Sequence, residues 1–280
     1  EQDGRLAPRF ITVLGTEVRD LDVAVRGNQR VLAARLADAR FFWDEDRKTG
    51  LDAWSKELGA VVFQAKLGTV AEKVERLQKL AKDLAPKLGA DVDATAEAAR
   101  LCKADLVTHM VGEFPDLQGV MGRYYARAQD SADAVAEAIL EHYQPRGAGD
   151  ALPPSAEGAA LALADRLDTL VGCIGAGLKP KGGGDPFGLR RATLGVLRIL
   201  LEREITASLG DLVRATAALH DKVTPDPDEV RQRTLPSWAR RTRKLLALGA
   251  STLALSAVGA CGEQEDDWDD YDTADLVDCE

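Results

Sequence analysis

Apolar residues recur at helical spacing through the middle of the chain. In residues 69–88, Val70, Val74, Leu77 and Leu80 are three or four positions apart, which places their side chains on one face of a helix. Similar spacing predicts further helices over 94–112, 119–129, 131–143, 155–176, 186–204 and 207–221. We therefore expect a mainly α fold.

The first forty residues follow a different pattern. The run RFITVL, Arg9 to Leu14, is rich in β-branched and aromatic residues and predicts a strand. Gly27 and Asn28 predict a turn, and a helix is expected from Gln29 to Phe42. We interpret residues 1–40 as a short α/β remnant of a neighbouring domain. The start at Glu1, without Met, indicates a fragment or a processed product.

Composition agrees with helices and changes the meaning of the charge. Only 5% of the 280 residues are aromatic, and Ala and Leu are abundant, which favours helix. The net charge is −10, but residues 262–280 hold ten Asp or Glu and no Lys or Arg, so the rest of the chain is neutral. A neutral body can still bind nucleic acid where Lys and Arg cluster locally.

Cysteine and histidine patterns exclude several kinds of site. No CxxC pair, HExxH motif, phosphate-binding glycine loop or GxSxG elbow occurs in the sequence. Neither a zinc site nor a disulfide framework is indicated, so a reduced, cytoplasmic setting fits best. The scattered residues are Cys102, Cys173, Cys261, Cys279, His109, His142 and His220.

Two loops interrupt the helices and carry charge. The first, YQPRGAGDALPPS, spans residues 143–155, and its prolines predict a surface loop. In the second, GLKPKGGGDPFGLRR, Asp185 is expected to cap a helix opened by Pro186. A glycine-rich turn before a helix N-terminus, with basic neighbours, suits a phosphate, although an ordinary capped turn has the same pattern. The basic neighbours are Lys179, Lys181, Arg190 and Arg191.

The segment EFPDLQGVMGRYYAR, residues 113–127, combines packing residues with Pro115, Gly119 and Gly122. Glycine inside a helix costs about 1 kcal/mol relative to alanine. The two glycines therefore indicate close backbone approach, a helix start or a bend.

Carboxylates on two predicted helices are candidates for metal ligation. Asp165 and Asp168 lie three residues apart on one helix face, and Asp105 lies on an earlier helix. These side chains could share a metal ion, or they could belong to two solvated faces.

Five motifs, in order and spacing, resemble one family from about Arg9 to Val230. They are ADARFFWDEDRKTGLDAWSKELGAVVFQAKLGTVAEKVERL, KADLVTHMVGEFPDLQGVMGRYYAR, YQPRGAGDALP, ALADRLDTL and KPKGGGDPFGLRRATLGVLRIL. The family is the β subunit of bacterial heterotetrameric glycyl-tRNA synthetase. The resemblance implies an HD-like helical domain over residues 41–230.

The resemblance also implies a role in protein synthesis. In that family the α subunit carries the ATP- and Mg-dependent activation of glycine, while the β subunit mainly recognises tRNA. The expected function is therefore a largely non-catalytic part of an α2β2 glycine–tRNA ligase in the cytoplasm, with the α subunit and the tRNA for glycine as partners. No cofactor is expected on this chain.

Particular residues receive roles from the same resemblance. Lys103, Ala104 and Asp105 stand where an HD phosphohydrolase has His-Asp, and Asp165 matches the last ligand. Because both histidines are missing, we expect no metal site, and a metal-dependent HD phosphohydrolase is the disfavoured alternative.

The EFPDLQG segment is similar to a family signature. Its glycines are expected to permit close helix packing, while its polar residues fix a turn. The signature residues are Glu113, Asp116, Gln118, Gly119, Gly122 and Tyr125. Arg123 and Arg127, or the Lys179 to Arg191 loop, are candidates for contact with tRNA phosphates; the alternative is that the arginines form surface ion pairs.

After Val230 these motifs end. Residues 231–260 contain a basic start and an apolar run, and resemble a lipoprotein signal before Cys261. The apolar run is shorter than the roughly 18–20 residues needed to span a bilayer, so no membrane partner is expected. Residues 261–280 are acidic and expected to be disordered. A gene-model join, a frameshift and a C-terminal anchor, as in a membrane-anchored lipoprotein, are the three open explanations.

Overall fold

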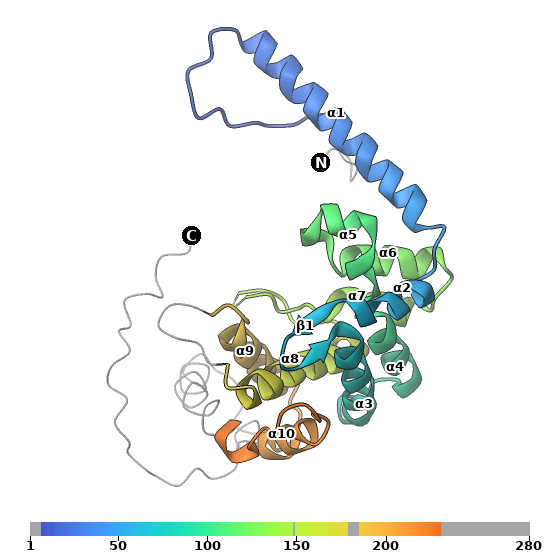
Figure 1. Cartoon of the computed structure of the whole chain (residues 1–280), viewed down its shortest axis with the longest axis vertical. Coiled ribbons are helices and arrows are strands. Elements are labelled where there is room, and N and C mark those ends of the chain that lie inside the picture. Colours follow the sequence, from blue (N-terminus) through green and yellow to red (C-terminus); the bar gives the residue numbers. More distant parts are fainter. Residues whose placement is uncertain (1–6, 148, 179–184, 231–280) are drawn as a thin grey trace. The chain divides into compact units, whose positions relative to one another are not determined.

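The structure is a computed structural model that describes residues 7–147, 149–178 and 185–230 (Figure 1). It divides into two compact units between Lys48 and Thr49. The prediction of a mainly helical fold is confirmed. No helix in these ranges has the length and apolar character to cross a membrane. The predicted signal-like segment 231–260 and acidic tail 261–280 lie outside the described residues.

Unit 1 contains one long helix, α1 (Leu21–Asp46), which begins earlier than predicted. Asp20 caps it by accepting from the backbone N–H of Val23 at 3.1 Å. The predicted turn at Gly27 and Asn28 is wrong, because both lie within α1, where the Asn28 side chain donates to the Ala24 carbonyl at 2.9 Å. The expected boundary at residue 40 falls inside this helix.

The strand predicted from Arg9 to Leu14 is also absent. A strand needs a neighbouring strand to bond its backbone, and the described part of the chain offers residues 10–14 none. The segment has the composition of a strand, but the described residues place no strand beside it.

Unit 2 begins with elements that the sequence did not predict. They are α2 (Leu51–Glu57), a 3₁₀ turn η1 (Leu58–Ala60), and an antiparallel hairpin of β1 (Val62–Gln64) and β2 (Gly68–Thr69). The strands hold three and two residues, too few for an alternating pattern to stand out. Leu58, Val70 and Val74 form a buried cluster against which Phe63 packs, so the hairpin is fixed to the start of α3.

The prediction over 69–88 is confirmed by α3 (Val70–Leu88). Thr69 and Glu72 form a reciprocal capping box, in which the Thr69 hydroxyl accepts from the Glu72 N–H and the Glu72 carboxylate accepts from the Thr69 N–H. Gly89, with a φ of 67°, ends the helix in the left-handed conformation that glycine adopts readily.

The single helix predicted over 94–112 is wrong in its middle. The chain forms α4 (Val92–Leu101), the 3₁₀ turn η2 (Ala104–Val107) and α5 (His109–Glu113). This break turns the side chains of Lys103 and Asp105 into the interior, where each meets a distant partner.

The helix α8 lies at the centre of unit 2 (Figure 1), and most of its residues are buried. It packs against α3, α4, α7, α9 and α10. After α5, the elements of unit 2 are the 3₁₀ turn η3 (Pro115–Leu117) and the helices α6 (Val120–Ala128), α7 (Asp133–Glu141), α8 (Ala156–Gly175), α9 (Leu189–Glu202) and α10 (Leu209–Ala217).

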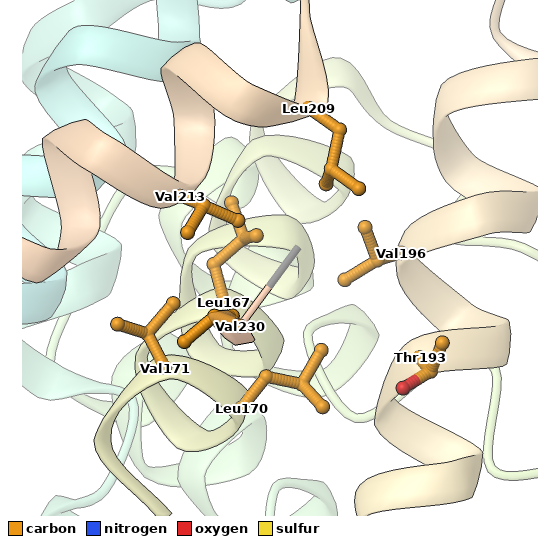
Figure 2. A pocket seen from close by; sticks show the side chains of 8 residues that line it. All are labelled: Leu167, Leu170, Val171, Thr193, Val196, Leu209, Val213 and Val230. Carbon is orange, nitrogen blue, oxygen red and sulfur yellow. The ribbon is translucent and has the colours of Figure 1, made fainter. Parts of the chain in front are cut away.

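A small hollow lies between α8, α9 and α10, with Val230 at its side (Figure 2). Its volume is about 10 Å³, which is room for a single water molecule at most. Thr193 supplies the hydroxyl in an otherwise apolar lining. The hollow is a packing gap and not a ligand pocket.

Candidate functional site

Charged and titratable side chains from five parts of unit 2, α8 among them, meet in what we call the buried charge cluster. Buried charges are costly unless they are paired. The partners of each carboxylate therefore show whether it is neutralised by a protein cation or is free to bind a metal ion. The cluster consists of Lys73, Arg76, Lys103, His142, Asp165, Asp168 and His220.

Asp168 is the most buried carboxylate of the cluster, with no exposed surface. Its oxygens lie 2.9 Å from Lys73 Nζ and 2.6 Å from Arg76 Nε, and His220 Nε2 lies 3.5 Å away. Burial alone would raise its pKa, but Lys73 and Arg76 lower that pKa below the ordinary aspartate value. Asp168 is therefore an ionised internal counterion and not part of a solvated face.

Asp165 lies between two ammonium groups. Lys73 Nζ is 2.8 Å from one carboxylate oxygen, and Lys103 Nζ is 3.0 Å from the other. Although burial opposes ionisation, the two lysines hold the pKa of Asp165 well below its usual range. Both oxygens thus face lysines.

Lys103 has two further partners in the interior. Its Nζ lies 2.8 Å from His142 Nε2 and 4.2 Å from the centre of the Tyr143 ring. His142 Nδ1 is 2.6 Å from the Ile139 carbonyl, which can only accept, so the ring proton lies on Nδ1 and Nε2 accepts from Lys103. Burial and the nearby ammonium lower the pKa of His142 well below its usual value, and the ring is neutral.

Asp105, the other position matched to the HD pattern, faces elsewhere. One of its oxygens accepts from the backbone N–H groups of Gly119 at 2.6 Å and Gly122 at 3.0 Å, at the start of α6. Its second oxygen has no hydrogen-bond partner among the residues that the structure describes. Asp105 is fully buried, and burial raises its pKa to about 6.

A substitution tests this ionisation of Asp105. The folded-state pKa of about 6 lies above the ordinary aspartate value of 3.8, so the folded state binds the proton more tightly and loses stability as pH rises from about 4 to 6. Asp105→Asn copies the protonated form. We expect urea unfolding to show the variant gaining on the wild type, on the order of 2–3 kcal/mol, between pH 4 and pH 7. A difference that is constant with pH would contradict the raised pKa.

The two HD-like carboxylates therefore do not converge. Asp165 bonds to lysines, and Asp105 bonds to backbone amides. Within residues 7–147, 149–178 and 185–230, no group of three or more His, Cys, Asp or Glu is placed to hold a metal ion. A transition metal would find the carboxylates of Asp165 and Asp105 already bonded to protein donors, and the His142 imidazole bonded to Lys103. This set of ligands is a poor fit for such a metal.

The EFPDLQG segment forms a tight corner. Gly119 has a φ of 79°, and a Cβ there would lie 2.5 Å from Tyr143 Cδ2. A Cβ on Gly122 would lie 2.7 Å from Ile139 Cγ2. The two glycines let α6 approach α7 closely, and the adjacent Tyr125 is only 2% exposed.

The polar signature residues are less buried than Asp105. Glu113 and Asp116 are exposed and Gln118 is half-buried. Both side-chain bonds to the Gly119 and Gly122 amides come from Asp105, a residue whose distance in sequence hid this role.

The tRNA-binding candidates on α6 lie in ion pairs. Arg127 is 2.7 Å from Glu137 and 3.4 Å from Asp133, and Arg123 is 3.4 Å from Glu137. Both acids lie on α7. The Arg123 side chain is half-buried, and the Arg127 side chain is exposed. This is the arrangement of the surface ion pairs named as the alternative.

The glycine-rich loop leads into an occupied helix start. The Asp185 carboxylate accepts from the N–H groups of Leu189 and Arg190, each at 2.8 Å, so these amides already have an anion. The helix begins at Leu189, with Gly188 at the N-cap, three residues later than predicted. Arg190 and Arg191 are exposed on its first turn. Lys179 and Lys181 lie outside the described residues.

Three arginines that the sequence analysis did not single out fix the 143–155 loop. Arg166 donates to the carbonyls of His142, Tyr143 and Pro145 at 2.9–3.1 Å. Arg198 donates to the Asp150 carbonyl at 2.7 Å, and Arg203 to the carbonyls of Pro153 and Pro154. The sequence feature that could have revealed these arginines is their position within apolar helical segments, where a cation needs an internal partner.

The sequence matches the family profile described as glycyl-tRNA synthetase beta subunit over residues 1–260, thirty residues beyond the position where we expected the resemblance to end. A glycine–tRNA ligase beta subunit of Trichlorobacter lovleyi is 50% identical over 243 residues, which are 86% of this chain and 35% of that protein. One from Neisseria gonorrhoeae is 54% identical over 202 residues, 72% of this chain and 29% of that protein. Another, from Citrifermentans bemidjiense, is 47% identical over 260 residues, 92% and 38%. The chain spans about a third of the length of these relatives.

Proposed function

This chain belongs to the glycyl-tRNA synthetase beta subunit family, and on that premise we propose that it is part of the β subunit of a glycine–tRNA ligase. Its role is to help bind the tRNA for glycine during ATP-dependent glycylation in the cytoplasm. In this proposal the α subunit of an α2β2 assembly supplies glycine activation with ATP and Mg²⁺. The family match over most of the chain carries the proposal.

The buried charge cluster supports a scaffold role for the helical domain. The oxygens of Asp165 and Asp168 are paired with lysine and arginine side chains. A metal-dependent phosphohydrolase would need those oxygens free for a metal ion. Robust metal-dependent phosphatase activity of the purified chain would overturn the scaffold role.

We place the RNA contact on the start of α9 and the loop before it. Arg190 and Arg191 are exposed side by side there, and an exposed cation can neutralise a phosphate and release its counterion. Lys179 and Lys181 precede this turn in the sequence and belong to the same proposal. Arg123 and Arg127 are further candidates, and both already pair with acids of α7.

A salt titration tests the proposal. We expect binding of the 280-residue chain to tRNA for glycine, followed by fluorescence anisotropy, to weaken steeply as salt rises. Changing Lys179, Lys181, Arg190 and Arg191 together to Gln should reduce the slope of log K against log salt by about one for each phosphate that is no longer neutralised.

The matched control removes the same charge elsewhere. Lys56, Lys79, Lys82 and Lys87 are exposed on α2 and α3, and changing them to Gln should leave the slope unchanged. Equal slopes for both quadruple variants would sink the assignment to α9. No binding at low salt would place recognition in the α subunit or in other parts of the β subunit.

A further inference from the structure

Exposed apolar side chains are concentrated in unit 1. Fifteen large hydrophobic side chains are exposed in the described residues, and eleven of them lie between Phe10 and Phe41. No apolar side chain from residue 7 to residue 48 is buried. A protein segment without a core of its own gains its stability by covering apolar surface elsewhere.

Four exposed apolar side chains lie on one side of α1, with Asn28 between the second and the third of them. Leu21, Val25, Leu32 and Leu36 are four, seven and four residues apart, so they lie on the same side of the helix. Their exposed fractions are 64%, 40%, 38% and 58%. Ala34 and Ala37 lie on the far side of this helix and provide matched control positions.

The segment before α1 has the properties of an unpaired strand. Ile11 is 97% exposed and Val13 is 91% exposed. In the described part of the chain, no backbone N–H from Phe10 to Leu14 donates to a backbone carbonyl. Unpaired backbone with β-branched side chains is the form in which a chain adds to the open edge of a sheet.

We propose that residues 10–14 and the apolar face of α1 dock on the part of the β subunit that this chain does not contain. Residues 10–14 add a strand to a sheet there, and the face formed by Leu21, Val25, Leu32 and Leu36 covers apolar surface beside it. The size of the relatives identifies the occupant, because this chain accounts for only 35% of the Trichlorobacter lovleyi protein. Unit 1 lies within the family match, so we expect members of the family to contain the same segment together with the remaining polypeptide. The proposal does not depend on tRNA binding.

A chimera tests the docking. The region of the Trichlorobacter lovleyi β subunit that matches this chain is replaced by this chain, and hydrogen exchange is compared with that of the 280-residue chain alone. We expect the amides of residues 10–14 and of α1 to exchange about 100-fold more slowly in the chimera. Leu32→Ser with Leu36→Ser should abolish this protection, whereas Ala34→Ser with Ala37→Ser, which introduces the same residue, should leave it intact.

Other outcomes overturn the proposal. Fast exchange in both proteins would mean that no docking occurs. Equal protection in the isolated chain would mean that unit 1 docks on its own chain, and protection that grows with concentration would identify a second copy. The α8 amides report whether each protein is folded. If the chimera does not fold, the intact Trichlorobacter lovleyi β subunit supplies the same comparison at its aligned residues.

Discussion

Replacing Asp168 by alanine is expected to destabilise unit 2 by about 3–5 kcal/mol. Its carboxylate bonds to Lys73 and Arg76, whose side chains are only 4% and 7% exposed. The substitution removes the carboxylate that pairs with Arg76 and one of the two carboxylates that pair with Lys73. Both cations stay buried, and neither can reach water without disturbing α3 or α8. Urea unfolding followed by far-UV circular dichroism measures the loss as a lower midpoint.

Two further variants show whether burial is the cause. Asp52→Ala removes an exposed carboxylate that pairs with Arg100, and we expect a change below about 1 kcal/mol. Removing Asp168 together with both cations, as Asp168→Leu with Lys73→Met and Arg76→Met, should restore most of the lost stability, because Asp165 loses Lys73 but keeps Lys103 as its partner. An Asp168→Ala protein as stable as wild type would show that the cluster is open to water.

Helical periodicity predicted the helices that are specified by residues close together in the sequence. The Val70 to Leu80 spacing placed α3 within one residue of its observed start, since an amphipathic face and a capping residue are both written in the sequence. The break between α4 and α5 could not be predicted in this way. It depends on Lys103 reaching Asp165 and on Asp105 reaching Gly119, and these contacts join segments far apart in the chain.

One feature of the sequence pointed to the buried charge cluster: two cations stand among the apolar residues of a predicted helix. Lys73 and Arg76 lie among Val70, Val74 and Leu77 on the buried face of α3. A cation at such a position needs an internal counterion, and Asp168 provides it. Without knowing which helix lies opposite, the Asp165 and Asp168 spacing fits a solvated face equally well, so the pairing required the structure.

The ion-pair partners of the candidate RNA-binding arginines also could not be identified from the sequence. Arg123 and Arg127 stand in a signature segment, but their partners lie on the next helix. Asp185 was visible in sequence as an acid before a helix start, and it accepts from the N–H groups of Leu189 and Arg190 in the first turn, although the N-cap residue is Gly188 and not Asp185 as predicted. Local capping was therefore predictable, whereas the neutralisation of a surface arginine was not.

The corner at Gly119 is expected to be the most sensitive backbone position in unit 2. Gly119→Ala should cost about 3–5 kcal/mol, because a side chain is strained at a φ of 79° and the new Cβ would lie 2.5 Å from the Tyr143 ring. That ring also lies against Lys103, with its centre 4.2 Å from Nζ. Movement of Tyr143 would therefore disturb the buried charge cluster as well. Thermal unfolding of the variant should show a correspondingly lower midpoint.

Gly112 supplies the control for this prediction, because it lies in α5, has an ordinary helical φ and leaves open space of 4 Å around the position that a Cβ would take. Gly112→Ala should be neutral or stabilising by up to about 1 kcal/mol, since alanine favours helix. If Gly119→Ala behaved like Gly112→Ala, the corner would have room for a side chain. The close approach of α6 to α7 would then need another explanation than the glycines of the signature segment.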